Sequence, residues 1–203
     1  GLENVYKSID FGDNWKKFSN IEGLGKYDRL VSLACSGKDT MLFYAAYANP
    51  SWDNDPKRKL FKTSNAGETW IDVTKGLKGV AWTNITSVIM DQQNPDVVFV
   101  GFRGGWDVKV MRSLNGGNSW EDYSSGFDND SDVNALITDT DDFHTVYAAT
   151  HNGVYKRNDK DKAWSRFGEG LPRVMVSGLD IRYDSGILFA GTHGRGIWSV
   201  KIR

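Results

Sequence analysis

The sequence predicts an all-β protein built from repeated units, and three observations lead to this prediction. Eight Trp, 22 Gly and only four Pro among 203 residues suit a chain of short strands and tight turns. Short apolar runs recur at even spacing, about four to each unit. An octapeptide that ends in Trp recurs every 44 to 55 residues, and such a period is typical of an array of equivalent supersecondary units.

The octapeptide reads hydroxyl, any residue, Asp or Asn, any residue, Gly, two polar residues and Trp. The Asp or Asn side chain can accept backbone N–H groups and close a turn, Gly permits positive φ, and Trp covers the turn. In the fourth copy Asp159 takes the acidic position and Asp161 stands where Gly is expected. The structural residues expected are Ser8, Asp10, Gly12, Trp15, Thr63, Asn65, Gly67, Trp70, Ser113, Asn115, Gly117, Trp120, Asp159 and Trp164.

The strands expected around these turns follow a four-per-unit rhythm from residue 30 onward. Residues 2–7 and 15–18 flank the first turn as two short strands. The second unit is expected at 30–35, 41–47, 59–63 and 69–73, the third at 85–90, 97–102, 108–112 and 119–123, and the fourth at 133–138, 145–149, 153–157 and 163–167. The fifth unit holds three strands, at 175–181, 187–191 and 196–202. Four short strands per repeat are typical of the blades of a β-propeller.

The repeated octapeptides resemble the Asp-box (BNR) repeat of sialidase-like, xyloglucanase-like and sortilin-like β-propellers. The resemblance implies an all-β propeller of four-stranded antiparallel blades, about four of them in this chain. The segments are a half blade at 1–26, blades at 27–76, 77–127 and 128–172, and a three-stranded closing blade at 173–203. Residues 190–198 resemble the usual ending of such proteins, so the chain is expected to be the C-terminal portion of a larger ring. A small five-bladed ring with one redundant strand is the alternative.

Composition excludes some classes of binding partner. A formal net charge of −1 argues against nucleic acid and anionic membranes, and no apolar run has the length of a membrane span. The single Cys35 lies in an apolar strand and is expected to be buried. The compartment follows only from the resemblance, which implies a secreted, periplasmic or cell-surface protein.

The loops on the face opposite the octapeptide turns carry the candidate ligand-binding residues. Trp52 and Trp106 lie in equivalent loops, each followed by an aspartate. An indole beside a carboxylate suits stacking on a sugar ring with hydrogen bonds to its hydroxyls, although packing between blades is an equal alternative. The candidate ligand-binding set is Trp52, Asp53, Trp82, Arg103, Trp106, Asp107, His151, His193 and Arg195.

The residues support catalysis and metal binding less than they support ligand binding. Glycoside hydrolysis needs two carboxyl groups across the scissile bond, and Asp53 and Asp107 are only weak candidates. The Arg-Ile-Pro signature of sialidases is absent from the sequence. His151 and His193 lack further ligands, since His144 is expected on the other face. No cofactor and no metal are expected.

The sequence thus predicts a non-catalytic extracellular module that recognises a glycan or a protein on this loop face. One alternative is a portion of a xyloglucanase-like or sialidase-like glycoside hydrolase, with catalytic carboxylates partly in missing blades. Another is a scaffold for assembly of a surface or secretion complex. The partner is accordingly a glycan, an extracellular protein or the remaining blades of the same propeller.

Overall fold

The computed structural model describes residues 5–19, 21–49, 58–78, 83–104, 106, 108–140 and 144–202, with the backbone alone at 18 and 19. All regular structure in these residues is β-strand, arranged in five antiparallel sheets. The described part of the chain offers no helix long and apolar enough to span a membrane.

The sheets follow one another along the chain, and three of them have four strands. The first sheet pairs β1 (Val5–Lys7) with β2 (Lys16–Ser19). The four-stranded sheets are β3 (Arg29–Cys35), β4 (Phe43–Ala48), β5 (Arg58–Thr63) and β6 (Ile71–Asp72); β7 (Asn84–Met90), β8 (Val98–Arg103), β9 (Val110–Ser113) and β10 (Glu121–Asp122); and β11 (Val133–Thr138), β12 (Val146–Thr150), β13 (Gly153–Arg157) and β14 (Ser165–Phe167). The fifth sheet contains β15 (Val176–Arg182), β16 (Ile187–Thr192) and β17 (Ile197–Lys201).

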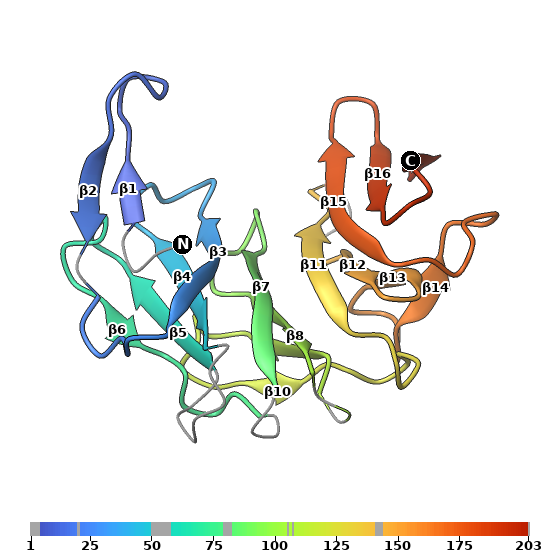
Figure 1. Cartoon of the computed structure of the whole chain (residues 1–203), viewed down its shortest axis with the longest axis horizontal. Helices are drawn as coiled ribbons and strands as arrows, with labels where there is room; N and C mark the ends of the chain where they lie inside the picture. Colours follow the sequence, from blue (N-terminus) through green and yellow to red (C-terminus); the bar gives the residue numbers. More distant parts are fainter. Residues whose placement is uncertain are drawn as a thin grey trace.

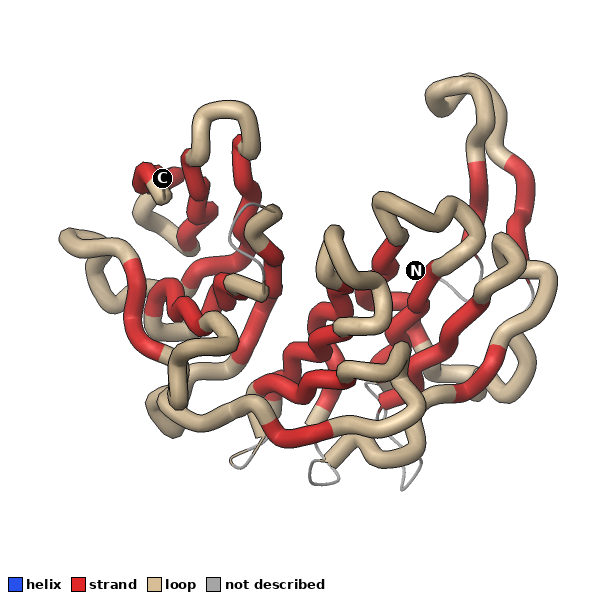
Figure 2. The backbone as a smooth tube through the Cα atoms, turned by 180° about the vertical axis from the view of Figure 1, so that it is seen from behind, coloured by secondary structure: helices blue, strands red, loops and turns tan. Residues whose placement is uncertain are grey.

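The first strand of each larger sheet lies beside the first strand of the next. β3 contacts β7, β7 contacts β11, and β11 contacts β15. Figures 1 and 2 show the sheets following an open arc, with the β1–β2 hairpin at one end and the β15–β17 sheet at the other. Sheets placed side by side through their first strands have the arrangement of propeller blades.

The core lies between successive sheets rather than within one. One cluster joins Leu60 of β5 to Val98 and Val100 of β8, and the next joins Val110 of β9 to Val146 of β12. A third cluster connects the fourth and fifth sheets. Since both faces of an inner sheet are covered, β4, β8 and β12 read as nearly continuous apolar runs instead of alternating ones.

The first three octapeptide turns share one set of hydrogen bonds. In each turn the hydroxyl accepts the glycine N–H at 2.8–2.9 Å, and the Asp or Asn oxygen accepts the N–H four residues on at 2.9–3.0 Å. The glycines Gly12, Gly67 and Gly117 have φ of 100°, 84° and 88°. The preceding residues Phe11 and Ala66 also have positive φ, as the two central positions of a type I′ hairpin turn require.

Two details differ from the sequence-based expectations. In the fourth turn Asn158, not Asp159, holds the loop, because its side chain accepts the N–H of Lys160 and its carbonyl accepts that of Asp161. The Asp159 carboxylate instead pairs with Arg112 of the preceding sheet. Cys35 is exposed rather than buried, because its face of β3 points away from β7 and no described sheet covers it.

Candidate ligand site at the inner strands

The same β-bulge interrupts the first strand of every larger sheet. Pairing with the second strand skips one residue at the same place in each sheet. The skipped residues are Val31, Thr86, Asn134 and Ser177. Because a bulge redirects the side chain of its extra residue, these four side chains leave the regular alternation of the strand.

All four bulge residues line one hollow of about 560 Å³. The other lining residues come from the starts of the first strands, the ends of β4 and β8, and the segment before β15. They are Arg29, Ala48, Asn84, Ile85, Arg103 and Met175. The hollow therefore lies where the inner strands begin, and four successive sheets contribute to it. We call it the axial hollow.

Two bulge side chains also fasten one sheet to the next. Thr86 Oγ1 donates to the Val133 carbonyl at 2.7 Å, and Asn134 Nδ2 donates to the Val176 carbonyl at 2.8 Å. Each acceptor is the residue just before the bulge of the following strand. These bonds fix the spacing of the first strands and hold the wall of the hollow in place.

The charged groups in this wall are cationic. Arg29 and Arg103 line the hollow, and no carboxylate is among the described residues that do. Arg29 is held by its own backbone surroundings, because Nη1 donates to the carbonyls of Lys26 and Asp28. Two guanidinium groups without a neighbouring carboxylate in the wall favour an anionic or strongly hydrogen-bond-accepting ligand.

Two aspartates beside lining residues, Asp28 before Arg29 and Asp132 bonded to the Gly104 N–H after Arg103, are already paired. Asp28 is buried and accepts Lys59 Nζ at 2.8 Å. Asp132 accepts Lys109 Nζ at 3.1 Å and the Gly104 N–H at 3.3 Å. Their negative charge is therefore largely compensated within the protein.

Asn84 supplies a polar group without a hydrogen-bond partner among the described residues. Its Oδ1 is buried, and no described residue donates a hydrogen bond to it. A buried acceptor without a donor costs free energy, so a hydrogen bond from a bound molecule to this oxygen would be favourable. The hollow thus offers guanidinium donors, an amide acceptor and apolar walls within one site.

Of the residues predicted from sequence, Arg103 alone among the described ones lines this hollow. Trp106 is 86% exposed and borders a separate hollow of about 460 Å³, lined also by Lys109, Asp122 and Asp128. Trp52, Asp53, Trp82 and Asp107 lie outside the described residues.

His151, His193 and Arg195 do not belong to the described lining of either hollow. The backbone N–H groups of His151 and His193 donate to the carbonyls of Asp132 and Met175, which ties the end of a second strand to the segment before the first strand of the same sheet. The Arg195 carbonyl accepts the Trp198 indole N–H at 3.0 Å. Among the described residues, no group of three or more His, Cys, Asp or Glu side chains could hold a metal ion.

Sequence reasoning missed the bulge residues, together with Arg29 and Asn84. A signal for the bulges exists in hindsight: Leu30–Ser32, Ile85–Ser87, Val133–Ala135 and Val176–Gly178 each place an apolar residue, a variable residue and a small residue in succession. The small third residue recurs where the chain returns to regular pairing.

Comparison with known proteins supports the fold and does not assign the chain to a family. No protein-family model and no curated protein matches the chain. A crystal structure of an ancestral GH74 enzyme superposes with a TM-score of 0.67 at 19% identity, over 94% of this chain and 25% of that one. The crystal structure of the GH74 xyloglucanase from Xanthomonas campestris superposes with a TM-score of 0.64 at 14% identity, over 85% of this chain and 29% of that one. The structure of YCF48 bound to D1 peptide superposes with a TM-score of 0.63 at 13% identity, over 98% of this chain and 59% of that one.

These similarities show that the chain has a β-propeller fold. The chain spans about a quarter of the two GH74 structures and about three fifths of YCF48. At identities below 20% the likeness carries the architecture, while function has to be argued from the site.

Proposed function

We propose that the chain is a non-catalytic recognition module that binds an extended peptide segment of a partner protein in the axial hollow. The observation that carries this proposal is the convergence of four equivalent bulges on one hollow with two arginines, an unpartnered amide oxygen and no described carboxylate in its wall. Peptide carbonyls and carboxylates match the arginines, and a peptide N–H matches Asn84 Oδ1.

Two further points support a peptide over a sugar at this place. The described lining of the hollow contains no aromatic side chain on which a sugar ring would stack. Among proteins of this fold, YCF48 has been seen with a peptide of D1. The proposal also assigns the repeated turns to the Asp-box type. It places the protein outside the cytoplasm, and a secretion assay in the source organism would check this location.

Peptide and glycan arrays probed in parallel test the proposal. We expect the wild type to bind a subset of peptides, and Asn84→Ala and Arg103→Ala each to weaken that binding about tenfold or more, because each removes a group that the ligand pairs with. Trp106→Ala is the matched control, since its indole borders the other hollow. Peptide binding that is lost with Trp106→Ala and kept in both hollow variants would overturn the proposal.

A glycan is the second candidate, and Trp106 favours it. Its exposed indole stands at the edge of a hollow with Asp122 and Asp128, which is the combination of apolar face and carboxylates that suits a sugar. Glycan-array binding that disappears with Trp106→Ala would establish this site. Hydrolysis of aryl-glycosides that disappears with Asp53→Asn or Asp107→Asn would instead support a portion of a glycoside hydrolase.

A further inference from the structure

Two polar side chains of the third sheet stand side by side in the wall of the axial hollow. Asn84 is the first residue of β7, Arg103 is the last residue of β8, and the two are direct partners in the register of these strands. Directly opposed residues of antiparallel strands share a face of the sheet, with Cβ atoms about 4.5–5.5 Å apart. The pair therefore places an amide acceptor next to a guanidinium donor.

Neither group of this pair has a partner in the described part of the chain. Asn84 Oδ1 is buried and receives no hydrogen bond there. The Arg103 side chain is exposed, and no described residue accepts a hydrogen bond from its guanidinium or forms an ion pair with it. A ligand that donates to the buried oxygen and accepts from the guanidinium therefore satisfies both groups at once.

The residue at the position of Asn84 differs from sheet to sheet, and where it is acidic its charge is balanced. The equivalent residues, two before each bulge, are Arg29, Asn84, Asp132 and Met175. Asp132 accepts Lys109 Nζ and the N–H of Gly104, the residue after Arg103. Asp132 thus holds this end of β8 in place, while the buried Lys109 compensates its negative charge.

Arg29 brings a second cation to the hollow from the neighbouring sheet. Its Nη1 donates to the carbonyls of Lys26 and Asp28 at 3.0 and 2.9 Å, which holds the guanidinium in one orientation. Its Nε and Nη2 have no acceptor among the described residues. The Asp28 carboxylate is bonded to Lys59 Nζ and to the Gly25 N–H instead. The positive charge of both arginines is therefore not compensated by any described carboxylate.

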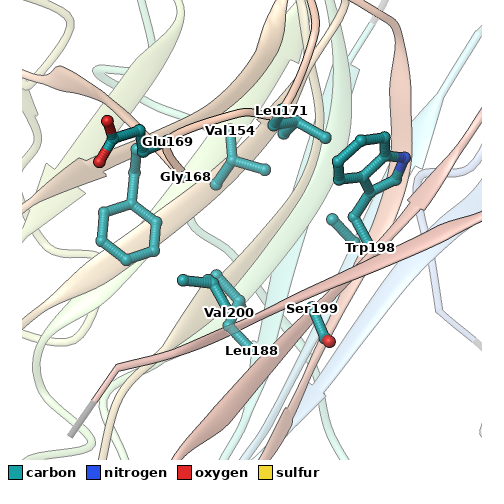
Figure 3. A pocket seen from close by; sticks show the side chains of 10 residues that line it. Val154, Gly168, Glu169, Leu171, Leu188, Trp198, Ser199 and Val200 are labelled. Carbon is teal, nitrogen blue, oxygen red and sulfur yellow. The ribbon is translucent and has the colours of Figure 1, made fainter.

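A smaller hollow between the fourth and fifth sheets has the opposite character. It measures about 40 Å³, and its described lining is apolar apart from Ser199 and Glu169. Figure 3 shows Glu169 among the apolar side chains of Val154, Leu171 and Leu188. Because like charges repel, an acidic group of a ligand is disfavoured there and favoured in the axial hollow.

The pair of Asn84 and Arg103 matches a backbone N–H that lies close to a carboxylate. Asn84 Oδ1 accepts the N–H, and the guanidinium binds the carboxylate in the bidentate geometry that arginine favours. Within a peptide, Asp and Glu offer both groups through the main chain and the side chain, and the C-terminal residue offers them through its N–H and terminal carboxylate. A neutral residue inside a peptide offers Arg103 only an uncharged carbonyl, which is a weaker partner.

We propose that the peptide in the axial hollow is anchored by a residue that carries a carboxylate, with its N–H on Asn84 and its carboxylate on Arg103. Arg29 adds electrostatic attraction from the neighbouring sheet. This inference rests on the proposed function, because it names the chemical class of the residue by which the bound peptide is held.

A peptide array with matched forms of every sequence tests for the carboxylate. Each acidic side chain is replaced by its amide, and each free C-terminus is compared with an amidated one. For the peptides that bind, we expect one of these changes to weaken binding about tenfold or more, and the change that does so identifies the source of the carboxylate. Binding that none of these changes weakens would overturn the inference and leave the proposed function standing, whereas an array without any bound peptide would overturn both.

A double-mutant cycle assigns the carboxylate to Arg103. In Arg103→Gln, the acidic peptide and its amide form should differ by less than about threefold, because the cationic partner is gone. Lys17→Gln is the matched control, since Lys17 is exposed and lines a separate cationic hollow on the β1–β2 hairpin; it should keep the tenfold difference. Circular dichroism confirms that both variants remain folded. A difference that persists in Arg103→Gln, or that disappears in Lys17→Gln, would overturn the assignment.

Discussion

Replacing Trp164 by Ala tests how strongly one sheet is held to the next. The Trp164 side chain is 3% exposed and contacts the rings of Phe127 and Tyr123 in the turn after the preceding sheet, the latter edge-on. It donates its indole N–H to the Tyr123 carbonyl at 2.6 Å. Truncation of a buried Trp costs about 3–5 kcal/mol, and the Tyr123 carbonyl also loses a donor. We therefore expect Trp164→Ala to lower the free energy of unfolding by about 4 kcal/mol.

Two further variants separate the parts of this effect. Trp164→Phe keeps most of the apolar contact and removes the N–H, so it should cost about 1–2 kcal/mol. Trp15→Ala removes a side chain that is about one third buried, so it should lower the free energy of unfolding by only about 1 kcal/mol. Urea unfolding followed by circular dichroism gives all three values. Equal losses for Trp164→Ala and Trp15→Ala would refute the claim that the indole joins successive sheets.

Three other predictions follow from named contacts. Thr86→Val keeps the shape of the side chain and removes its hydrogen bond to the Val133 carbonyl, so it should lower the free energy of unfolding in urea by about 1 kcal/mol. An unchanged free energy of unfolding would show that this bond does not stabilise the contact between the two sheets. In the same assay, Gly126→Ala should lower the free energy of unfolding by more than about 3 kcal/mol, because φ is 104° and the new Cβ would clash with the Trp164 backbone. Gly170→Ala, where φ is also positive but the space around the glycine is open, should lower it by about 1–2 kcal/mol. The bond from Asn14 lowers the pKa of Asp10 to about 2, with help from Ser8, so the turn should keep this stabilisation above pH 4 and lose it as the pH falls toward about 2; an NMR titration midpoint near the ordinary 3.8 would contradict this.

The strand order and the turns could be predicted because their causes are local. Strand periodicity, the glycine at the positive-φ position and the Trp that follows lie within a few residues of one another, so the sequence displays them together. The fourth turn was less predictable. Asn158 and Asp159 are both able to cap a turn, and only the pairing of β13 with β14 decides which of them faces it.

Burial and the bulges depend on contacts between distant parts of the chain. Cys35 lies in an apolar strand, yet it is exposed because no described sheet covers its face of β3, whereas Met90, at the equivalent position of β7, is covered by the preceding sheet. The positions of Val31, Thr86, Asn134 and Ser177 follow from how first and second strands pair, which no single strand reveals. Arg103 was predictable because it ends a second strand, where propeller loops meet the axis.

The convergence of the four bulges on one hollow is the claim on which the account depends most. A nitroxide attached to Val31→Cys, in a background where the exposed Cys35 is replaced by Ser, would measure it through paramagnetic broadening of amide NMR signals. We expect strong broadening at Thr86, Asn134 and Ser177 and sharp signals in the turn around Asn158. Broadening that reaches the Asn158 turn while Asn134 and Ser177 stay sharp would contradict the arrangement of sheets described above.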